Sequence, residues 1–194
     1  MGIFSSRVEN KSVLITGTSQ GIGLAAASLL AKDGWIVFAG VRKQADFDKL
    51  QALHSNIRPV FLDVTKPEQI ADAIETVRVA VGSSGLDALV NNAGGSHTSP
   101  IEFFPPDDFE YEFKLNMFGV FRLTQAAIPL LRAGKPGRVI IVSSLAGRSP
   151  LPMSCAYCAA KHALEAFSSI LRQELKSSGK QLDTSLDSTM RFPV

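Results

Sequence analysis

The chain has 194 residues and a net charge of +2, from 20 Lys and Arg against 18 Asp and Glu. With 45% hydrophobic and 20% charged residues it has the composition of one globular domain, which excludes a disordered chain. The near-neutral balance gives no reason to expect a nucleic-acid or anionic-membrane partner. Two cysteines are too few for a disulfide framework or a four-ligand zinc site, so we expect a cytoplasmic protein without a metal.

Two features at the amino end concern targeting. Residues 12–31 carry no charge and resemble a signal peptide superficially, but the polar and glycine-rich segment 17–21 interrupts them. No continuous apolar segment remains for a leader or a membrane span, and we expect no transmembrane segment. Met1-Gly2 with Ser6 matches the N-myristoylation pattern, which leaves lipidation at Gly2 as an alternative.

Apolar and amphipathic blocks alternate along the chain. The pattern predicts strands at 13–16, 36–41, 58–62, 86–90 and 138–143, and helices at 22–32, 45–54, 66–81, 107–132 and 154–178. Uninterrupted apolar strands such as 139–142 indicate burial on both faces. We therefore predict a single Rossmann-like α/β domain, a doubly wound parallel sheet of strand order 3-2-1-4-5. Residues 12–179 would form it, after an extension at 1–11 and before a tail at 180–194.

The helix expected at 107–132 carries one polar residue in its apolar stripe. The stripe members follow at steps of four and three residues: Phe109, Phe113, Asn116, Val120, Leu123, Ala127 and Leu130. Asn116 is either a satisfied core residue or a group turned toward a site, and periodicity alone leaves both open. Pro129 is expected to kink or break the helix.

The segment Thr16–Gly23 lies between the first predicted strand and the first helix, where it reads Thr-Gly-Thr-Ser-Gln-Gly-Ile-Gly. Glycines allow a tight turn and a close approach to a pyrophosphate, and the following helix offers free N–H groups to that anion. The segment therefore predicts dinucleotide binding, with contacts from Gly17, Ser19, Gln20, Gly21, Ile22 and Gly23.

Other interpretations of this segment stay open from its letters alone. Gly17 to Gly21 also reads Gly-x-Ser-x-Gly, the nucleophile elbow of hydrolases. Only sixteen residues precede it, and the candidate bases His54, His97 and His162 have no distinctive context. A plain glycine turn is the third interpretation.

The end of the second strand bears on the choice of dinucleotide. A site that prefers NAD usually has an acidic residue there, about 20 residues after the glycines. This chain has Gly40-Val41-Arg42-Lys43, and Arg42 can pair with a 2′-phosphate. We expect NADP, with NAD the less favoured cofactor and a solvated pair of cations the alternative.

Tyr157 and Lys161 are spaced four residues apart on the last helix and share a face. A nearby ammonium lowers the pKa of a phenol, which would make Tyr157 a general acid and base. The pair alone is weak evidence, but Ser143-Ser144 and Asn91-Asn92-Ala93-Gly94 follow strands whose carboxyl ends meet the glycine segment at one sheet edge.

With these motifs in order, the chain resembles the short-chain dehydrogenase/reductase family, closest to its retinol and hydroxysteroid branch. The resemblance rests on the Thr-Gly-x-x-x-Gly-x-Gly segment, Asp63, the Asn-Asn-Ala-Gly run, Asn116, Ser144 and Tyr157-x-x-x-Lys161. The resemblance implies NADP-dependent hydride transfer between nicotinamide and a carbonyl or alcohol. Ser144 is preferred to Ser143 because it lies thirteen residues before Tyr157, the family spacing.

The resemblance also implies individual roles. Tyr157 would exchange the proton, Lys161 would assist it and hold the nicotinamide ribose, Ser144 would bind the reacting oxygen, and Asn116 would hold a relaying water. Further cofactor contacts are implied for Asp63, Val64, Asn91, Ala93 and Gly94. The long helices would pair two chains into a homodimer.

Residues near the expected site are mostly small or apolar, at 95–97, 145–147 and 151–153, with Arg148 the one nearby cation. We therefore expect an apolar small-molecule substrate such as a steroid, retinoid or lipid. Cys155 and Cys158 form a Cys-x-x-Cys pair around Tyr157, for which a redox role is an alternative to plain packing.

The tail at 180–194 departs from the resembling family. It has no Pro-Gly and no clear strand pattern where that family continues with a strand, a loop over the nicotinamide and a lid. We therefore predict that the strand at 138–143 is left as an open sheet edge. The alternative function that follows is a shortened, non-catalytic NADP-binding or dimerising form.

Overall fold

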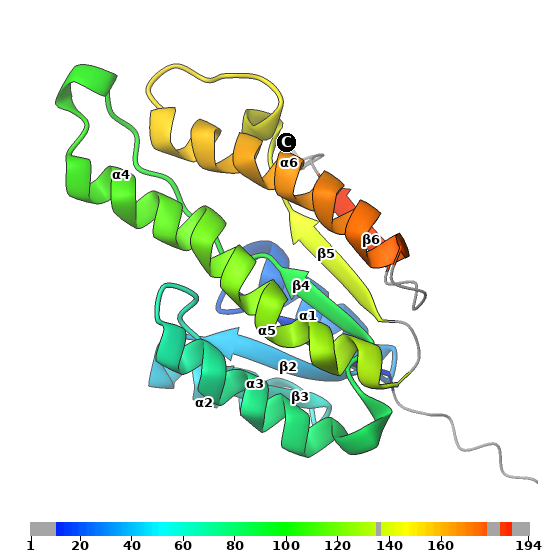
Figure 1. Cartoon of the computed structure of the whole chain (residues 1–194). Coiled ribbons are helices and arrows are strands. Elements are labelled where there is room, and N and C mark those ends of the chain that lie inside the picture. Colours follow the sequence, from blue (N-terminus) through cyan, green and yellow to red (C-terminus); the bar gives the residue numbers. More distant parts are fainter. Residues whose placement is uncertain (1–10, 135–136, 178–182, 188–194) are drawn as a thin grey trace, which may run out of the picture.

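The computed structural model describes residues 11–134, 137–177 and 183–187, and its centre is a parallel sheet of strand order β3-β2-β1-β4-β5-β6 (Figure 1). The strands are β1 (Ser12–Ile15), β2 (Ile36–Val41), β3 (Ile57–Phe61), β4 (Ala88–Asn91), β5 (Arg138–Val142) and β6 (Asp183–Asp187). The predicted doubly wound fold and the order of the first five strands are confirmed.

Helices cover both faces of the sheet. They are α1 (Gly21–Lys32), α2 (Gln44–Leu53), α3 (Pro67–Val81), α4 (Pro106–Phe113), α5 (Gly119–Ala133) and α6 (Cys155–Ser177). Short turns of helix are η1 (Gly82–Ser84), η2 (Ile101–Phe103), η3 (Lys114–Phe118) and η4 (Leu145–Gly147). Apolar residues of α3, α5 and α6 pack on one face, and those of α1 and α2 on the other. Burial of both faces explains the uninterrupted apolar strands.

The parallel registers bring the carboxyl ends of the strands to one edge. Leu14 of β1 pairs with Phe38 of β2 and with Leu89 of β4, and Leu89 pairs with Val139 of β5. All four side chains are buried. The segments that follow these strands therefore emerge beside one another, as expected for a ligand site in an open α/β sheet.

The predicted continuous helix at 107–132 is wrong in one respect. A π-helical turn, η3, separates α4 from α5, and its wider winding turns the chain locally without ending the helical path. Pro129 lies inside α5 and does not end it, so of the kink or break expected there the break is wrong. The 4-3 spacing of the apolar stripe reads through η3 without a break, but the structure buries Glu112 before the turn and leaves Phe109 39% exposed.

The expectation of an open edge at β5 is wrong as well. β6 pairs with β5 in parallel, from Arg138↔Asp183 to Val142↔Asp187. Residues 183–187 contain one apolar residue and give no strand signal. Without β6, the outer edge of β5 would present unpaired N–H and C=O groups. A strand can pair with these backbone groups without having apolar side chains. The lipidation motif at Gly2 and most of the predicted extension and tail lie outside the described residues.

Candidate active site

The glycine segment forms a tight cradle between β1 and α1. Gly17 and Gly21 have φ values of 68° and 59°, in the left-handed region that favours glycine. A Cβ at Gly23 would collide with the carbonyl oxygen of Gly17 and lie 2.6 Å from Nδ2 of Asn92. The backbone therefore packs too closely here for any side chain at position 23.

Asn92 fastens the cradle to the segment after β4. Its Nδ2 donates to the carbonyl oxygens of Thr16 at 2.9 Å and Gly17 at 3.2 Å. The backbone N–H groups of Asn92 and Ala93 both donate to Oγ1 of Thr16, at 2.9 and 2.8 Å. The hydroxyl of Thr18 donates to the carbonyl of Gly40 at 3.0 Å, which ties the cradle to β2. Sequence reasoning placed Asn92 in a motif but missed this clamp.

The start of α1 is open to an anion. Gln20, directly before the helix, makes no capping hydrogen bond with its side chain, and Gln20, Gly21 and Ile22 are exposed. Helix N-termini carry free N–H groups and a partial positive charge. The donors and space needed for a pyrophosphate are therefore present, with Ser19 half-buried beside them.

The other predicted cofactor residues line the same edge in different ways. Arg42 is exposed after β2, with Nη1 3.5 Å from the Tyr111 hydroxyl. Asp63 is half-buried, and its Oδ1 accepts from the N–H and hydroxyl of Thr65 at 3.0 and 2.7 Å. The side chain of Val64 is buried in the core. Of these three, Arg42 and Asp63 keep polar groups at the surface of the edge.

The segment after β4 has an inner and an outer part. Asn91 is buried, and its Nδ2 donates to the hydroxyl of Thr124 at 3.0 Å, so its side chain points into the fold. Gly94 and Gly95 are exposed. The structure therefore places Ala93 and Gly94, more than the Asn91 side chain, toward the edge where a cofactor would lie.

Asn116 lies on the π turn η3 and is fully buried. Its Nδ2 donates to the carbonyls of Gly95 at 2.8 Å and Glu112 at 3.0 Å, and its Oδ1 accepts from the N–H of Gly95 at 3.2 Å. A Cβ at Gly94 would lie 2.9 Å from that Oδ1 and 3.7 Å from Nζ of Lys161. The π turn therefore brings Asn116 up to the segment that borders Lys161.

Tyr157 and Lys161 lie on the first turns of α6. Nζ of Lys161 is 5.5 Å from the centre of the Tyr157 ring and donates to the carbonyl of Val142, at the end of β5, at 2.9 Å. Lys161 is 3% exposed, and burial lowers its pKa to about 8. Near neutral pH an ammonium group thus stands beside a half-buried phenol.

The two serines after β5 differ in their surroundings. Ser143 is buried, and its hydroxyl donates to Oε1 of Glu165 at 2.8 Å. Ser144 is half-buried and begins η4, where its hydroxyl accepts from the N–H of Ala146 at 3.2 Å. A Cβ at Gly147 would lie 3.0 Å from the carbonyl oxygen of Lys161. Close packing at Gly147 therefore holds η4, and Ser144 with it, against α6.

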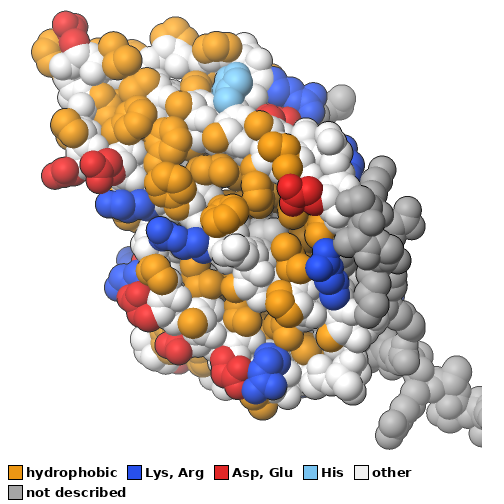
Figure 2. Space-filling model, viewed as in Figure 1, with side chains coloured by type: hydrophobic (Ala, Val, Ile, Leu, Met, Phe, Trp, Pro, Cys, Tyr) orange, Lys and Arg blue, Asp and Glu red, His pale blue; other side chains and the backbone are white. Residues whose placement is uncertain are grey.

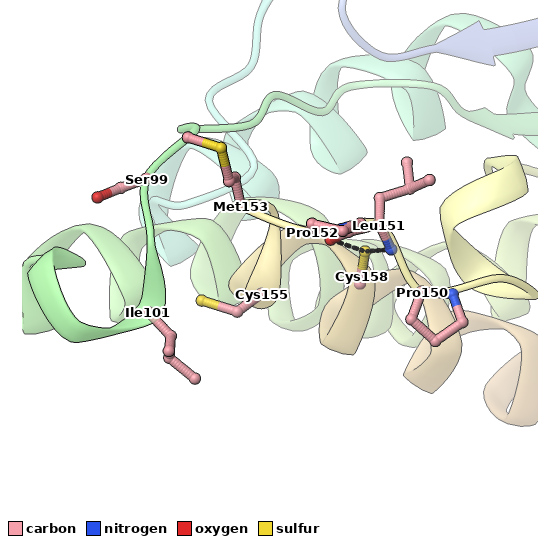
Figure 3. A pocket seen from close by; sticks show the side chains of 8 residues that line it. All are labelled: Ser99, Ile101, Pro150, Leu151, Pro152, Met153, Cys155 and Cys158. Carbon is pink, nitrogen blue, oxygen red and sulfur yellow. Dashed lines mark hydrogen bonds between the residues drawn. The ribbon is translucent and has the colours of Figure 1, made fainter.

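A cavity of about 520 Å³ opens between the segment after β4 and the start of α6 (Figure 3). Its lining comprises Ser99, Ile101, Pro150, Leu151, Pro152, Met153, Cys155 and Cys158. The N–H of Ser99 donates to the carbonyl of Met153 at 2.9 Å and joins its two walls. Most of the lining is apolar, which suits an apolar ligand.

The structure also bears on the rival interpretations. Nδ1 of His54 accepts from the N–H of Asn56, Nδ1 of His162 contacts the Cys158 carbonyl, and His97 lies beside Asp108. None of these contacts links a histidine to Ser19, which is the pairing that a serine nucleophile needs. The thiol of Cys158 is within hydrogen-bond distance of the backbone N–H and carbonyl of Leu151, a packing contact (Figure 3). Among the described residues, no cluster suits a metal ion.

Comparison with known proteins gives concordant results. A family model described as short chain dehydrogenase matches residues 11–182. Estradiol 17-beta-dehydrogenase 2 of Mus musculus is 43% identical over 182 residues, covering 91% of this chain and 47% of that protein. Mitochondrial D-beta-hydroxybutyrate dehydrogenase of Mus musculus is 36% identical over 176 residues, covering 87% and 51%. The chain thus spans about half the length of these two relatives.

A solved structure agrees with them. A short-chain dehydrogenase from Streptomyces avermitilis superposes with a TM-score of 0.88 at 31% identity, over 95% of this chain and 66% of that one. Within the part of the chain that the structure describes, no helix is long and apolar enough to cross a membrane.

Proposed function

The chain belongs to the short-chain dehydrogenase family, a family of NAD(P)-dependent oxidoreductases, and from this premise we propose that it transfers hydride between NADP and an apolar carbonyl or alcohol, with Tyr157 as general acid and base. The observation that carries the proposal is the placement of the Lys161 ammonium 5.5 Å from the Tyr157 ring and close to Gly94, which follows the segment bonded to the glycine cradle. The resemblance noted from the motifs is confirmed by these comparisons.

The residues divide the chemistry among them. NADP, when bound, supplies or accepts the hydride. Tyr157 gives a proton to the substrate oxygen during reduction and takes one during oxidation. Lys161 places its ammonium 5.5 Å from the Tyr157 ring, and the Ser144 hydroxyl orients the reacting oxygen. Asn116, held by both polar groups of Gly95, keeps the segment beside Lys161 in place.

Preference for NADP rests on Arg42. It is exposed at the end of β2, with no acidic residue from Gly40 to Lys43 to repel a 2′-phosphate. Arg42→Asp should weaken NADPH binding by about 1.5–3 kcal/mol, the range for charge-assisted hydrogen bonds. Lys32→Asp is the matched control, because it makes the same charge change at the far end of α1. Equal affinity of the unmodified chain for NADPH and NADH, by fluorescence titration, would contradict this preference.

The substrate class is inferred from the cavity of Figure 3. Ile101, Leu151 and Met153 lie in its lining, and Arg148 is engaged by Glu165 at 3.5 Å. An apolar alcohol would bury its surface there, whereas a small charged one would lack a partner. The relatives include dehydrogenases named for both kinds of alcohol, so estradiol and D-beta-hydroxybutyrate are the two probes.

We expect the chain to reduce NADP⁺ with estradiol faster than with D-beta-hydroxybutyrate, followed by the absorbance of NADPH. Tyr157→Phe is the control for the proton step. Faster reaction with hydroxybutyrate would contradict the apolar substrate. Nucleotide binding without turnover of any alcohol or ketone would identify a non-catalytic NADP-binding protein instead.

Self-association through α4, α5 and α6 is part of the proposal. These helices already bury residues such as Leu123 and Leu164 against the sheet. Apolar side chains remain outside: Phe109, Phe118, Phe121 and Ile170 are 39–54% exposed, and Figure 2 shows apolar side chains gathered over these helices. Burying them against a second copy would form a homodimer. A monomer at tens of micromolar, by light scattering, would count against it.

A further inference from the structure

A buried carboxyl group that the proposed mechanism does not use lies in the last turn of α4. Glu112 is 3% exposed, and its Oε1 accepts a hydrogen bond from the backbone N–H of His97. Its Oε2 is buried and has no hydrogen-bond partner among the described residues. Buried carboxyl groups are costly, so one in a half-exposed helix suggests a role beyond packing.

Glu112 belongs to a set of contacts that hold the site loop, here defined as Gly94–Ser99. Alternate residues of the site loop are fixed from outside it. Gly95 is held by Asn116, His97 by Glu112, and Ser99 by the carbonyl of Met153. Glu112 and Asn116 are four residues apart, and Nδ2 of Asn116 also donates to the Glu112 carbonyl. One helical face therefore holds two of the three fixed points.

The site loop connects the two functional parts of the site. At one end, Gly94 lies close to Oδ1 of Asn116 and to Nζ of Lys161. At the other end, Ser99 lines the cavity beside Met153 (Figure 3). A shift of the loop would therefore change the distance between the cavity and the Lys161 side of the site. Small displacements of substrate from the catalytic groups lower the reaction rate strongly.

We propose that Glu112 is a positioning residue that fixes the site loop between the proposed catalytic groups and the substrate cavity, an inference that rests on the proposed function. It acts through His97, the middle fixed point. Without it the backbone of His97 would lose its hydrogen bond, and only the ring would stay in contact with Asp108 and Phe104.

The surroundings of Glu112 raise the pKa of its carboxyl on balance. Burial raises the pKa of the carboxyl, against the lowering effect of the His97 N–H and of charge on His97, while Asp108 raises it further. Lys161, on the helix packed against α4, is engaged by the Val142 carbonyl. Gln has the same length and also offers an acceptor oxygen to the His97 N–H, so Glu112→Gln should preserve the contact and Glu112→Ala should remove it.

Hydrogen exchange of the backbone amides of the site loop tests the inference without requiring activity. In the full chain, the His97 amide should exchange at least about tenfold faster in Glu112→Ala, because its acceptor is gone, and within about twofold in Glu112→Gln. Glu110→Ala, which removes an exposed carboxylate of the same helix, is the matched control. If Glu112→Ala does not fold, Glu112→Met replaces it, since it fills the space without an acceptor. If the His97 amide exchanges at the unmodified rate in Glu112→Ala and in Glu112→Met, the proposal is overturned.

Kinetics then show whether the loop position serves catalysis. With estradiol and NADP⁺, Glu112→Ala should lower kcat/KM at least about tenfold, Glu112→Gln should restore it, and NADPH affinity should stay within about twofold. Equal kcat/KM in all variants, or equal loss in Gln and Ala, would overturn the proposal. If the His97 amide exchanges faster in Glu112→Ala alone and no chain shows turnover, the proposed function is refuted, but the role of Glu112 in positioning the site loop is supported.

Discussion

The nucleotide side and the catalytic side of this site are built by different means. At the nucleotide side, backbone atoms approach so closely that Gly17 and Gly23 have no room for a Cβ. At the catalytic side, buried polar side chains such as Asn116, Lys161 and Ser143 each bond to a defined partner. The nucleotide side should therefore be sensitive to added atoms, and the catalytic side to lost partners.

The largest effect is expected from adding an atom to the cradle. In Gly23→Ala the new methyl group would collide with the Gly17 carbonyl and the Asn92 amide. We expect the free energy of unfolding to fall by on the order of 1–3 kcal/mol and NADPH affinity to fall at least about tenfold, by denaturant melts and fluorescence titration.

Gly34→Ala is the comparison variant, because its φ of 86° is unfavourable for Ala, a strain that Gly23 does not have, while the surrounding space is open. It should cost only the strain of about 1 kcal/mol and leave the NADPH affinity unchanged. Similar losses of affinity in both variants would show that the cradle is not sensitive to added atoms.

Burial of Lys161 predicts a pH-dependent stability. Its folded pKa of about 8 lies below the ordinary value of 10.5, so the unfolded chain binds more protons between these values. Burial of the charge therefore costs stability below pH 8, and the cost declines as pH rises. Lys161→Met removes this cost. The free energy of unfolding of the variant minus that of the unmodified chain should therefore decrease by about 2 kcal/mol between pH 7 and 9.5.

Urea melts of both chains at each pH measure this difference. Lys32→Met, at the exposed end of α1, is the control, because it removes the same charge from a side chain that is not buried. A constant difference across the pH range for Lys161→Met would mean that the ammonium is not desolvated in the folded chain.

Two adjacent asparagines offer the finest comparison. Asn92→Ala removes the two hydrogen bonds to Thr16 and Gly17 and should weaken NADPH binding by about 1 kcal/mol. Asn91→Ala removes the bond to Thr124 inside the fold and should lower stability by a similar amount without weakening NADPH binding. If both changes weaken NADPH binding equally, Asn92 is not distinguished from Asn91 by its hydrogen bonds to the cradle.

The parts predicted from the sequence are those with local signals. Glycine spacing and uninterrupted apolar strands identified the cradle and the sheet, and the 4-residue spacing of Tyr157 and Lys161 placed both on one face. Three features had no such signal. The π turn around Asn116 leaves the apolar spacing almost unchanged, β6 pairs through its backbone, and Asn92 acts on a segment 76 residues away. Glu112 could have been noticed from its spacing to Asn116, but a Glu on a helix usually faces water.

The central claim is that binding and chemistry are separate, with Tyr157 carrying the chemistry. The most direct measurement is NADPH affinity and turnover of estradiol with NADP⁺ in the same preparation of Tyr157→Phe. We expect affinity within about twofold of the unmodified chain and turnover reduced by at least about a hundredfold, the loss expected for a general acid and base. Turnover within a few-fold of the unmodified chain would contradict the assignment of Tyr157.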